Sequence, residues 1–381
     1  MRKITFCFWA LVLAATMLVL TAAPGPALSP KPRPRRLGLN FGDIPTGRLN
    51  AITDVSGVKV GHVTLVEGDS IRTGVTAIVP HAGNLYQEKM PAAIHVGNGY
   101  GKLAGLSQVR ELGQLETPVL LTNTLSVGAV MEGVVRYTLS LSGNQRVRSV
   151  NAVVGECNDG YLNDIRGLHV RPRHAVEAIE RARPGAVAEG CVGAGTGTVC
   201  HRFKGGIGTS SRTPGEFTLG VLVQTNFGRS LVLQGVPVGR LLQRYSLSEA
   251  ANPTAAGSCM VVIATDAPLD ARSLERLAAR AMLGIGRTGG ISSSTSGDYI
   301  IAFSTAPGLR IKHGQTTQNS APELSHKQMN TLFAAVIDAT EEAIVNSLFA
   351  AETTRGRAGH RVPALPVDKA LQVMRQYRHL P

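Results

Sequence analysis

The stretch GSCMVVIATDAPLD (257–270) places a glycine and a serine directly in front of an apolar run. Residues 260–264 carry no charged or hydroxyl side chain, which is typical of a strand buried on both faces. The pair Thr265-Asp266 follows at once and indicates a turn at the end of this strand. A loop that enters a buried strand explains the pattern. A nucleophilic Ser258, held at the start of the strand behind a cleavable Gly257, is a second explanation, for which the pair by itself is weak evidence.

Strands and helices alternate after this run. Asp270 or Ser273 can cap a helix whose apolar face is Leu274, Leu277, Ala278 and Ala281, and we expect Gly284 and Gly286 to end it. The segment 297–305 reads as another strand. Ser325-x-x-Gln328 is a capping box that predicts a long amphipathic helix after it.

The sequence before residue 257 contains further short β-like runs that are separated by glycine turns. Residues 117–140 start as a strand and continue as a helix, and residues 173–182 form a helical pattern with Val176, Ile179 and Ala182 on one face. We see no strict alternation of strand, helix and strand. Strand groups that carry long amphipathic helices predict the α/β class, as a four-layer α-β-β-α sandwich with two sheets between helices.

The start of the chain has the pattern of an export signal. Arg2 and Lys3 precede an uncharged run from Ile4 to Ala23, and small residues follow it. We therefore expect a signal peptide over 1–27 and a periplasmic or secreted protein. The uncharged run is also long enough to span a bilayer, so that an uncleaved anchor stays open as an alternative.

The positive charge of the chain is concentrated near its start. Six basic residues and no acidic ones lie within residues 1–36, and they supply six of the thirteen net positive charges. We expect KPRPRR (31–36) to be an exposed linker with polyproline character, within a basic arm over 28–48. Aromatic residues make up 4% of the chain and do not interleave with basic clusters. Nucleic acid is therefore not an expected partner.

The cysteines and glycine loops do not indicate a cofactor. Four cysteines remain after the leader, without CxxC or CxxH spacing, so that no metal and no organic cofactor is predicted: Cys157, Cys191, Cys200 and Cys259. A disulfide between Cys191 and Cys200 stays open. The loop VGAGTGT (192–198) lacks the lysine of a phosphate-binding loop, and we expect it to be a structural turn.

A histidine-based serine hydrolase is not favoured by the sequence. It contains no convincing G-x-S-x-G elbow, and five histidines are scattered without a partner context: His62, His81, His95, His169 and His174. A cut before Ser258 would supply another base, because a free α-amine has a pKa of about 7.7–8.0 and can take the proton of its own hydroxyl. Gly257 suits such a cut because it has no Cβ to obstruct the attack.

Several separated motifs resemble the family of L-aminopeptidase/D-esterases and β-peptidyl aminopeptidases. These are self-processing enzymes related in fold to the amino-terminal nucleophile hydrolases. The similar segments are GSCMVVIATDAPL (257–269), SGDYIIAFST (296–305), VLVQTNFG (221–228) and VVGECNDGYLND (153–164), with TNTLSVG, GAGTG and KGGIGTSSR as further matches. The resemblance extends from about residue 49 to residue 350.

This resemblance implies a role for each matching residue. Ser258 would be the nucleophile and the first residue of a β chain (258–381), after self-cleavage from an α chain (49–257). Ser296 and Asp298 would assist proton transfer, and the Asn226 side chain would donate to the oxyanion. Glu156 would bind the amino group of the substrate. The implied substrates are short peptides or amino-acid amides and esters with a free amino group.

The resemblance also implies a homo-oligomer of αβ units, without membrane contact once the signal is removed. Cys157, Cys191 and the short Asp298, which is often glutamate in the family, depart from the pattern and leave the substrate preference open. An acyltransferase of the N-acetylornithine type, which uses threonine as its nucleophile, is one alternative. A non-catalytic periplasmic binding protein on the same scaffold is the other.

Overall fold

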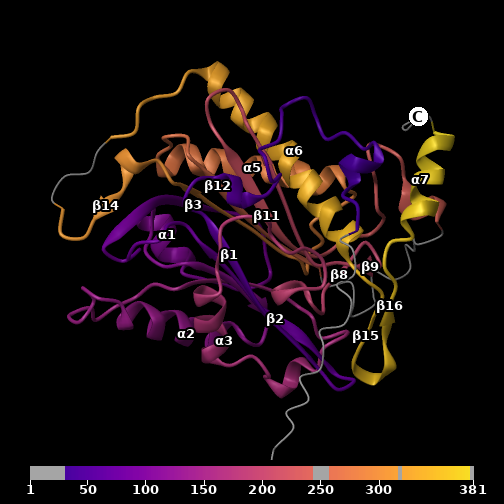
Figure 1. Ribbon diagram of the computed structural model, residues 1–381, viewed down its shortest axis with the longest axis horizontal. Coiled ribbons are helices and arrows are strands. Elements are labelled where there is room, and N and C mark those ends of the chain that lie inside the picture. Colours follow the sequence, from indigo (N-terminus) through magenta and orange to yellow (C-terminus); the bar gives the residue numbers. More distant parts are fainter. Residues whose placement is uncertain (1–30, 243–256, 316–319, 378–381) are drawn as a thin grey trace, which may run out of the picture. The chain divides into compact units, whose positions relative to one another are not determined.

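Two β-sheets carry the fold in the computed structural model, which describes residues 31–242, 257–315 and 320–377 (Figure 1). The first sheet has the order β1 (Lys59–Glu67), β2 (Ile71–Val79), β6 (Val119–Asn123), β7 (Val153–Cys157), β4 (Leu103–Ala104). The second has the order β10 (Ile207–Arg212), β11 (Leu219–Asn226), β12 (Ser258–Thr265), β13 (Gly297–Ser304), β3 (Glu88–Gly99), β14 (Ile311–Lys312), and β5 (Gln114–Leu115) also pairs with β3. The predicted signal peptide lies outside the described residues.

Each sheet contains one pair of parallel strands joined by a helix. Strands β6 and β7 run parallel and are joined through α2 (Val127–Ser140). Strands β12 and β13 run parallel and are joined through α5 (Ala271–Arg287). In the described ranges strands and helices therefore do not alternate strictly, as expected: each sheet has one helix-connected parallel pair among otherwise antiparallel neighbours.

Apolar side chains alternate between the two faces of β12. Val261 and Ile263 join a buried cluster with residues of α5 and α6 (His326–Ala350). Val262 and Ala264 join a second cluster with residues of the five-stranded sheet. A third cluster lies between that sheet and the helices α2 and α3 (Pro172–Glu180). Figure 1 shows α5 and α6 on one side of the strands and α2 and α3 on the other. The predicted α/β class is confirmed.

Smaller elements complete the described part of the chain. They are β8 (Val199–Cys200) with β9 (Phe203–Lys204), β15 (Thr354–Arg355) with β16 (Arg361–Val362), and the helices α1 (Leu106–Leu112), α4 (Val238–Leu241) and α7 (Val367–Gln376). The loop 192–198 contains a 3-10 turn at Gly193–Gly195. No helix in the described ranges is long and apolar enough to cross a membrane.

The long helices begin as the sequence predicts, but α5 ends later. The Asp270 side chain accepts from Ser273 N at 2.8 Å, and Ser325 and Gln328 form the capping box of α6. Gly284 does not end α5, which continues to Arg287. A Cβ at Gly284 would lie 2.7 Å from Thr340 Cβ. Glycine is therefore required there because α5 and α6 cross closely, not because the helix stops.

The pair Thr265-Asp266 fastens the end of β12 to the start of β11. The Thr265 hydroxyl donates to Thr218 O at 2.9 Å, and Asp266 Oδ1 accepts from Thr218 N at 2.7 Å. Because β11 and β12 are antiparallel, these bonds close the pair at the end far from Ser258. The sequence indicated a turn at this pair but not these hydrogen bonds to the neighbouring strand.

The basic arm is not an exposed polyproline linker. Residues 34–37 form a 3-10 helix, and Arg33 Nε lies 2.9 Å from Glu189 Oε2. Arg35 Nε binds Glu342 Oε1 of α6 at 2.8 Å, and the buried Arg212 binds the same carboxylate at 2.7 Å. The prediction was wrong because the acidic partners of these arginines lie more than 150 residues away in the sequence.

We expect Glu342→Gln to destabilise the protein strongly. The substitution leaves Arg212, whose side chain is 0% exposed, without its anionic partner, and breaking a buried pair from one side costs about 3–5 kcal/mol of unfolding free energy. Thermal unfolding at a fixed scan rate should show a midpoint lower by several degrees. Glu275→Gln is the matched control, because Glu275 pairs with His95 at a half-exposed position. Equal midpoints for the two variants would contradict this expectation.

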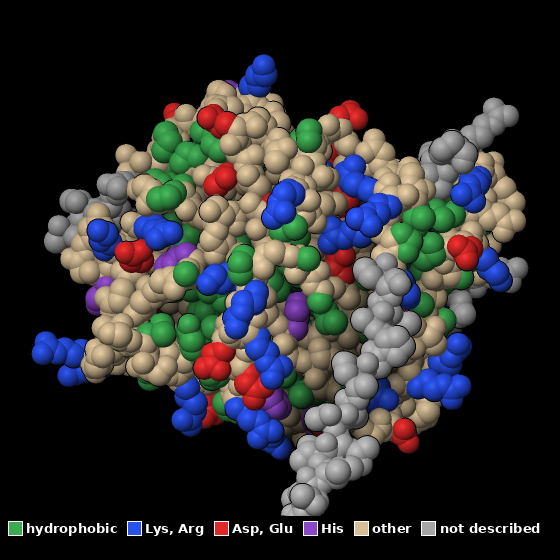
Figure 2. All heavy atoms as spheres, viewed as in Figure 1, with side chains coloured by type: hydrophobic (Ala, Val, Ile, Leu, Met, Phe, Trp, Pro, Cys, Tyr) green, Lys and Arg blue, Asp and Glu red, His purple; other side chains and the backbone are tan. Residues whose placement is uncertain are grey.

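Acidic and basic side chains share the surface, and the cysteines of the described ranges form no disulfide. On the face drawn in Figure 2, acidic side chains are interspersed among Lys and Arg. The cysteines Cys157, Cys191, Cys200 and Cys259 are free thiols, so that the disulfide considered between Cys191 and Cys200 is not formed. No cluster of three or more His, Cys, Asp or Glu side chains suited to a metal ion occurs among the residues described.

Candidate active site

The register of three adjacent strands brings the predicted catalytic residues together. Strand β12 lies between β11 and β13, with Ser258 opposite Asn226 on one side and opposite Gly297 on the other. Ser258 and Asn226 are 6% and 7% exposed, and Ser296 and Asp298, which flank Gly297, are each 1% exposed. Residues from three separated motifs therefore meet at the same end of one sheet.

The carbonyl group of Gly257 is held by two donors. Ser258 Oγ donates to Gly257 O at 2.8 Å, and Gly297 N donates to the same oxygen at 3.1 Å. The Ser296 hydroxyl is close by, because its oxygen lies 3.4 Å from where a Cβ on Gly257 would stand. The peptide bond between Gly257 and Ser258 thus has two hydroxyl groups beside it and a polarised carbonyl.

Ser296, which directly precedes β13, is held by Asp298 of that strand. Ser296 Oγ donates to Asp298 Oδ1 at 2.8 Å. Burial raises the pKa of Asp298, and hydrogen bonds from the Ser296 and Ser292 side chains oppose that rise. This contact shows that the short aspartate side chain is long enough to reach Ser296.

The side chain of Asn226 is oriented by a backbone group. Its Oδ1 accepts from Val199 N at 2.9 Å, at the start of β8. This bond assigns the oxygen and the nitrogen of the amide and leaves Nδ2 as the donor of the side chain. Because Asn226 stands opposite Ser258, that donor belongs to the same end of the sheet as the Ser258 hydroxyl.

Glu156 approaches this group from the facing sheet. The neighbouring Cys157 Sγ lies 3.5 Å from Ser258 O, which brings the end of β7 against the start of β12. Gly101 lies between the two sheets at this point. A Cβ on it would be 3.1 Å from Glu156 Oε1 and 3.2 Å from Gly297 Cα. The structure therefore places all five predicted site residues in one region.

The Glu156 carboxylate is buried, and a hydroxyl and a backbone group hold it. It is 2% exposed. Its Oε1 accepts from Lys102 N at 3.0 Å, and its Oε2 accepts from the Thr124 hydroxyl. Within the described ranges no Lys, Arg or His forms an ion pair with it. A buried carboxylate in this state is suited to bind a cationic group.

Some groups of this region were not predicted as site residues. Gly297 N and Lys102 N act through the backbone, which side-chain patterns do not reveal. Thr124 lies in the quoted segment TNTLSVG but was given no role. The Tyr299 hydroxyl donates to Gly101 O at 2.8 Å, and burial together with the charges of Glu156 and Asp298 raises its pKa.

The histidines do not supply a base for Ser258. No hydrogen bond within the described ranges joins a histidine to Ser258. Burial lowers the pKa of His62 to about 4 and that of His201 to about 3. His62 contacts Thr76, and His201 contacts Thr288. These buried rings stay neutral near pH 7 and have structural roles.

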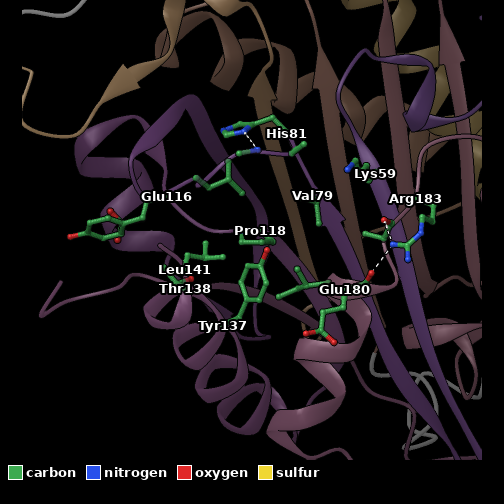
Figure 3. A pocket seen from close by; sticks show the side chains of 16 residues that line it. Lys59, Val79, His81, Glu116, Pro118, Tyr137, Thr138, Leu141, Glu180 and Arg183 are labelled. Atoms are coloured by element: carbon green, nitrogen blue, oxygen red, sulfur yellow. Dashed lines mark hydrogen bonds between the residues drawn. The ribbon is translucent and has the colours of Figure 1, made fainter. Parts of the chain in front are cut away.

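A separate cavity of about 210 Å³ lies at the opposite end of β6. It is lined by Pro118, which precedes β6, and by side chains from several other elements, among them Lys59, His81, Tyr137 and Glu180 (Figure 3). The Asn123 end of β6 adjoins Glu156 instead. None of the predicted site residues lines this cavity, which is therefore distinct from the region around Ser258.

The chain is similar to known peptidases and aminopeptidases over most of its length. Residues 50–362 match the model of peptidase family S58. Beta-peptidyl aminopeptidase BapA of Sphingosinicella microcystinivorans is 40% identical over 93% of this chain and 95% of its own length. A beta-aminopeptidase of Burkholderia sp. is 42% identical and covers 90% of this chain with 98% of its own, at a TM-score of 0.82.

A further solved structure bears on the fold. The L-aminopeptidase D-ala-esterase/amidase of Ochrobactrum anthropi, described as a variant of the Ntn hydrolase fold, is 36% identical and superposes with a TM-score of 0.84. It covers 92% of this chain and 100% of its own. The family match spans most of the sequence and includes every predicted site residue. The chain therefore belongs to peptidase family S58, the group that its separated motifs resemble.

Proposed function

We propose that this chain is a self-processing aminopeptidase in which Ser258 becomes an amino-terminal nucleophile. An aminopeptidase of this family is the activity that the relatives support. The mechanism is supported by the hydrogen bonds of the Gly257 carbonyl oxygen, which accepts from Ser258 Oγ and from Gly297 N. The Ser296 hydroxyl lies beside the same residue.

In the first reaction the chain cleaves itself. Ser258 Oγ attacks the carbonyl carbon of Gly257, and its proton passes to the departing Ser258 nitrogen, with Ser296 as the nearby hydroxyl for the transfer. Gly297 N–H stabilises the negative charge that develops on Gly257 O. The C–N bond breaks and leaves an ester at Oγ. Water then hydrolyses the ester, which gives a carboxylate at Gly257 and restores the Ser258 hydroxyl beside a free amine.

In the second reaction the new amine acts as the base for turnover. It takes the proton of Ser258 Oγ, which attacks the carbonyl carbon of the substrate, and the Asn226 amide donates to the oxyanion. Ser296, held by Asp298, hydrogen-bonds to the amine and orients it. The leaving amine takes a proton as the acyl-enzyme forms, and water releases the acid.

Glu156 restricts this reaction to the amino end of the substrate. Its buried carboxylate would pair with the ammonium group, a short distance from the carbonyl under attack. Tyr100 and Leu125, which are 66% and 48% exposed, adjoin Gly101 and Thr124 and provide apolar surface for side chains of short peptides, amides or esters. Such substrates have a β-amino acid or an α-amino acid at their first position.

The packing contacts support a four-layer α-β-β-α arrangement related to the amino-terminal nucleophile hydrolases. Each sheet packs on one face against the other sheet and on the other face against helices. An exported enzyme, cleaved after its leader and assembled from several αβ units, is the form that we propose for the mature protein.

Glu156→Gln should abolish the preference for a free amino group. The substitution keeps the size and one acceptor oxygen, but it removes the charge that an ammonium group would pair with, so that kcat/KM should fall roughly 10- to 100-fold. The measurement compares a free and an N-acetylated alanyl anilide. Glu177→Gln on the exposed surface of α3 is the control. An unchanged ratio of the two rates would argue against the proposed role.

Amino-terminal sequencing of the smaller fragment, together with an activity assay, tests the whole proposal. At the mean residue mass of this 40.1 kDa chain, cleavage before Ser258 gives fragments of about 13 and 24 kDa after loss of the leader. The smaller one should begin Ser-Cys-Met, and the protein that contains both fragments should cleave β-alanyl or α-alanyl anilides. An active protein of full length would refute self-processing. Faster acyl transfer to an amine than to water would indicate an acyltransferase instead.

A further inference from the structure

The side chain of Lys204, at the end of β9, is buried among backbone carbonyl groups. It is 0% exposed. Its Nζ donates to Gly195 O, in the loop 192–198, at 2.9 Å and to Gly205 O at 2.8 Å. In the described part of the chain no carboxylate forms an ion pair with it. The ammonium group therefore joins the loop to the residue that follows β9.

This position is costly for a lysine. Burial lowers the pKa of Lys204, because the charged form loses its contact with water. Two neutral carbonyl groups compensate that loss less well than a carboxylate would. A methionine would fill a similar volume without a charge to bury. Lys204 begins the quoted segment KGGIGTSSR but was given no role, and the cost of its burial indicates that it has one.

The two carbonyl groups that Lys204 binds belong to residues that also hold Thr198. Gly205 N donates to Thr198 O at 3.1 Å. The Thr198 hydroxyl donates to Gly195 O at 3.1 Å, so that this oxygen accepts from Thr198 and from Lys204. In the hairpin of β8 and β9, Val199 stands opposite Lys204. The position of the peptide group between Thr198 and Val199 therefore depends on Lys204.

That peptide group orients the side chain of Asn226. Its carbonyl oxygen accepts from Gly205 N, and its amide, Val199 N, donates to Asn226 Oδ1 at 2.9 Å. The amide groups thus follow one another with each donor directed toward Asn226. Hydrogen bonds that run in one direction polarise and strengthen one another in a buried setting. Asn226 Nδ2 is the last donor of this series.

We propose that Lys204 is a positioning residue for the oxyanion donor of turnover. By joining the loop 192–198 to β9, it keeps Val199 N aimed at Asn226 Oδ1 and leaves Nδ2 directed at the carbonyl oxygen of the substrate. This inference rests on the proposed function, in which Asn226 donates to the oxyanion. The hydrogen bonds of Lys204 go to backbone carbonyl groups, so that its effect passes through Asn226 and lies in the chemical step.

Lys204→Met tests this role, because methionine keeps the length of the side chain and removes the ammonium group. For a free-amine alanyl anilide, kcat per mole of cleaved β chain should fall roughly tenfold, while KM stays within about twofold. Self-cleavage should slow less than turnover, since Gly257 O has its own donor in Gly297 N. Unchanged kcat, a loss that lies in KM alone, or equal slowing of both reactions would overturn the inference.

The matched control is Lys89→Met. Lys89 is 14% exposed and binds Glu116 Oε2 at 2.6 Å, at the end of β3 opposite to the one that pairs with Gly297. This variant also loses an ammonium group, and it leaves a buried carboxylate without its cation, so that its thermal midpoint should fall. We expect its kcat to equal that of the wild type. A tenfold fall in kcat here would show that lost stability alone slows turnover and would overturn the inference.

Thr198→Val decides the question if Lys204→Met yields no folded protein. Valine keeps the shape of Thr198 and removes the hydroxyl that donates to Gly195 O, so that the same loop is loosened without touching the lysine. We expect kcat to fall roughly three- to tenfold at constant KM. Unchanged kcat in a folded and processed Thr198→Val would overturn the inference.

Asn226→Ala separates this inference from the proposed function, because it removes the amide without adding a charge. In that background Lys204→Met should lower kcat by no more than about twofold, since its effect passes through the amide that is already lost. A further tenfold loss would overturn the inference. If Asn226→Ala itself keeps a normal kcat, the proposed role of Asn226 fails. If it loses turnover and Lys204→Met does not, the inference fails alone.

Discussion

Ser258→Ala should leave the chain uncut and without activity. The substitution removes the oxygen that attacks the Gly257 carbonyl and, later, the carbonyl of the substrate, whereas its small size suits the buried start of β12. Loss of the nucleophile from a serine hydrolase lowers the rate by a factor on the order of 10⁴–10⁶. Denaturing electrophoresis should show one band of precursor, and an alanyl anilide assay should show no turnover above background.

Ser304→Ala is the control that separates chemistry from packing. Ser304 lies at the far end of β13, is 0% exposed, and donates to Ala267 O at 2.7 Å. This variant loses a buried hydroxyl from the same sheet, and we expect it to be processed and active. Two fragments from Ser258→Ala would exclude Ser258 as the group that cleaves the chain. Full activity of an uncut Ser258→Ala would exclude it as the nucleophile of turnover too.

The fold could be predicted from local patterns where those patterns are strong. The uninterrupted apolar run 260–264 predicts a strand buried on both faces, and the structure confirms this with alternating contacts to helices and to the facing sheet. The caps at Asp270 and Ser325 are confirmed for the same reason, because a cap is decided by residues within one turn. Gly284 was misread because its neighbour α6 lies far along the sequence.

Contacts between residues far apart in the sequence could not be predicted from local patterns. That Asn226 stands opposite Ser258 follows from the strand register, which depends on packing across the whole sheet. The ion pairs of Arg33 and Arg35 join the start of the described chain to Glu189 and Glu342, and the composition of either segment gives no sign of its partner. The same limit applies to the surroundings of Glu156. The motif gave Glu156 a role, but the Thr124 hydroxyl and Lys102 N that hold it come from two other segments.

Asn226→Asp should reduce turnover by removing one oxyanion donor at nearly constant shape. An aspartate can still accept from Val199 N through one oxygen, so that the start of β8 keeps its hydrogen bond. The donor nitrogen is replaced by a second oxygen, which bears negative charge where negative charge develops in the transition state. Loss of one such donor lowers kcat about 10²- to 10³-fold, and the added repulsion makes the upper end of that range the expected result.

The pattern of kinetic constants distinguishes this role from a structural one. An oxyanion donor acts in the transition state, so that kcat and kcat/KM should fall together while KM changes little. The rate of self-cleavage should fall less than the rate of turnover, because the Gly257 oxygen has its own donor in Gly297 N. Asn226→Asp therefore separates the two reactions at Ser258. Equal loss of processing and of turnover would show that Asn226 serves both carbonyl groups, and normal kcat would exclude it as the oxyanion donor.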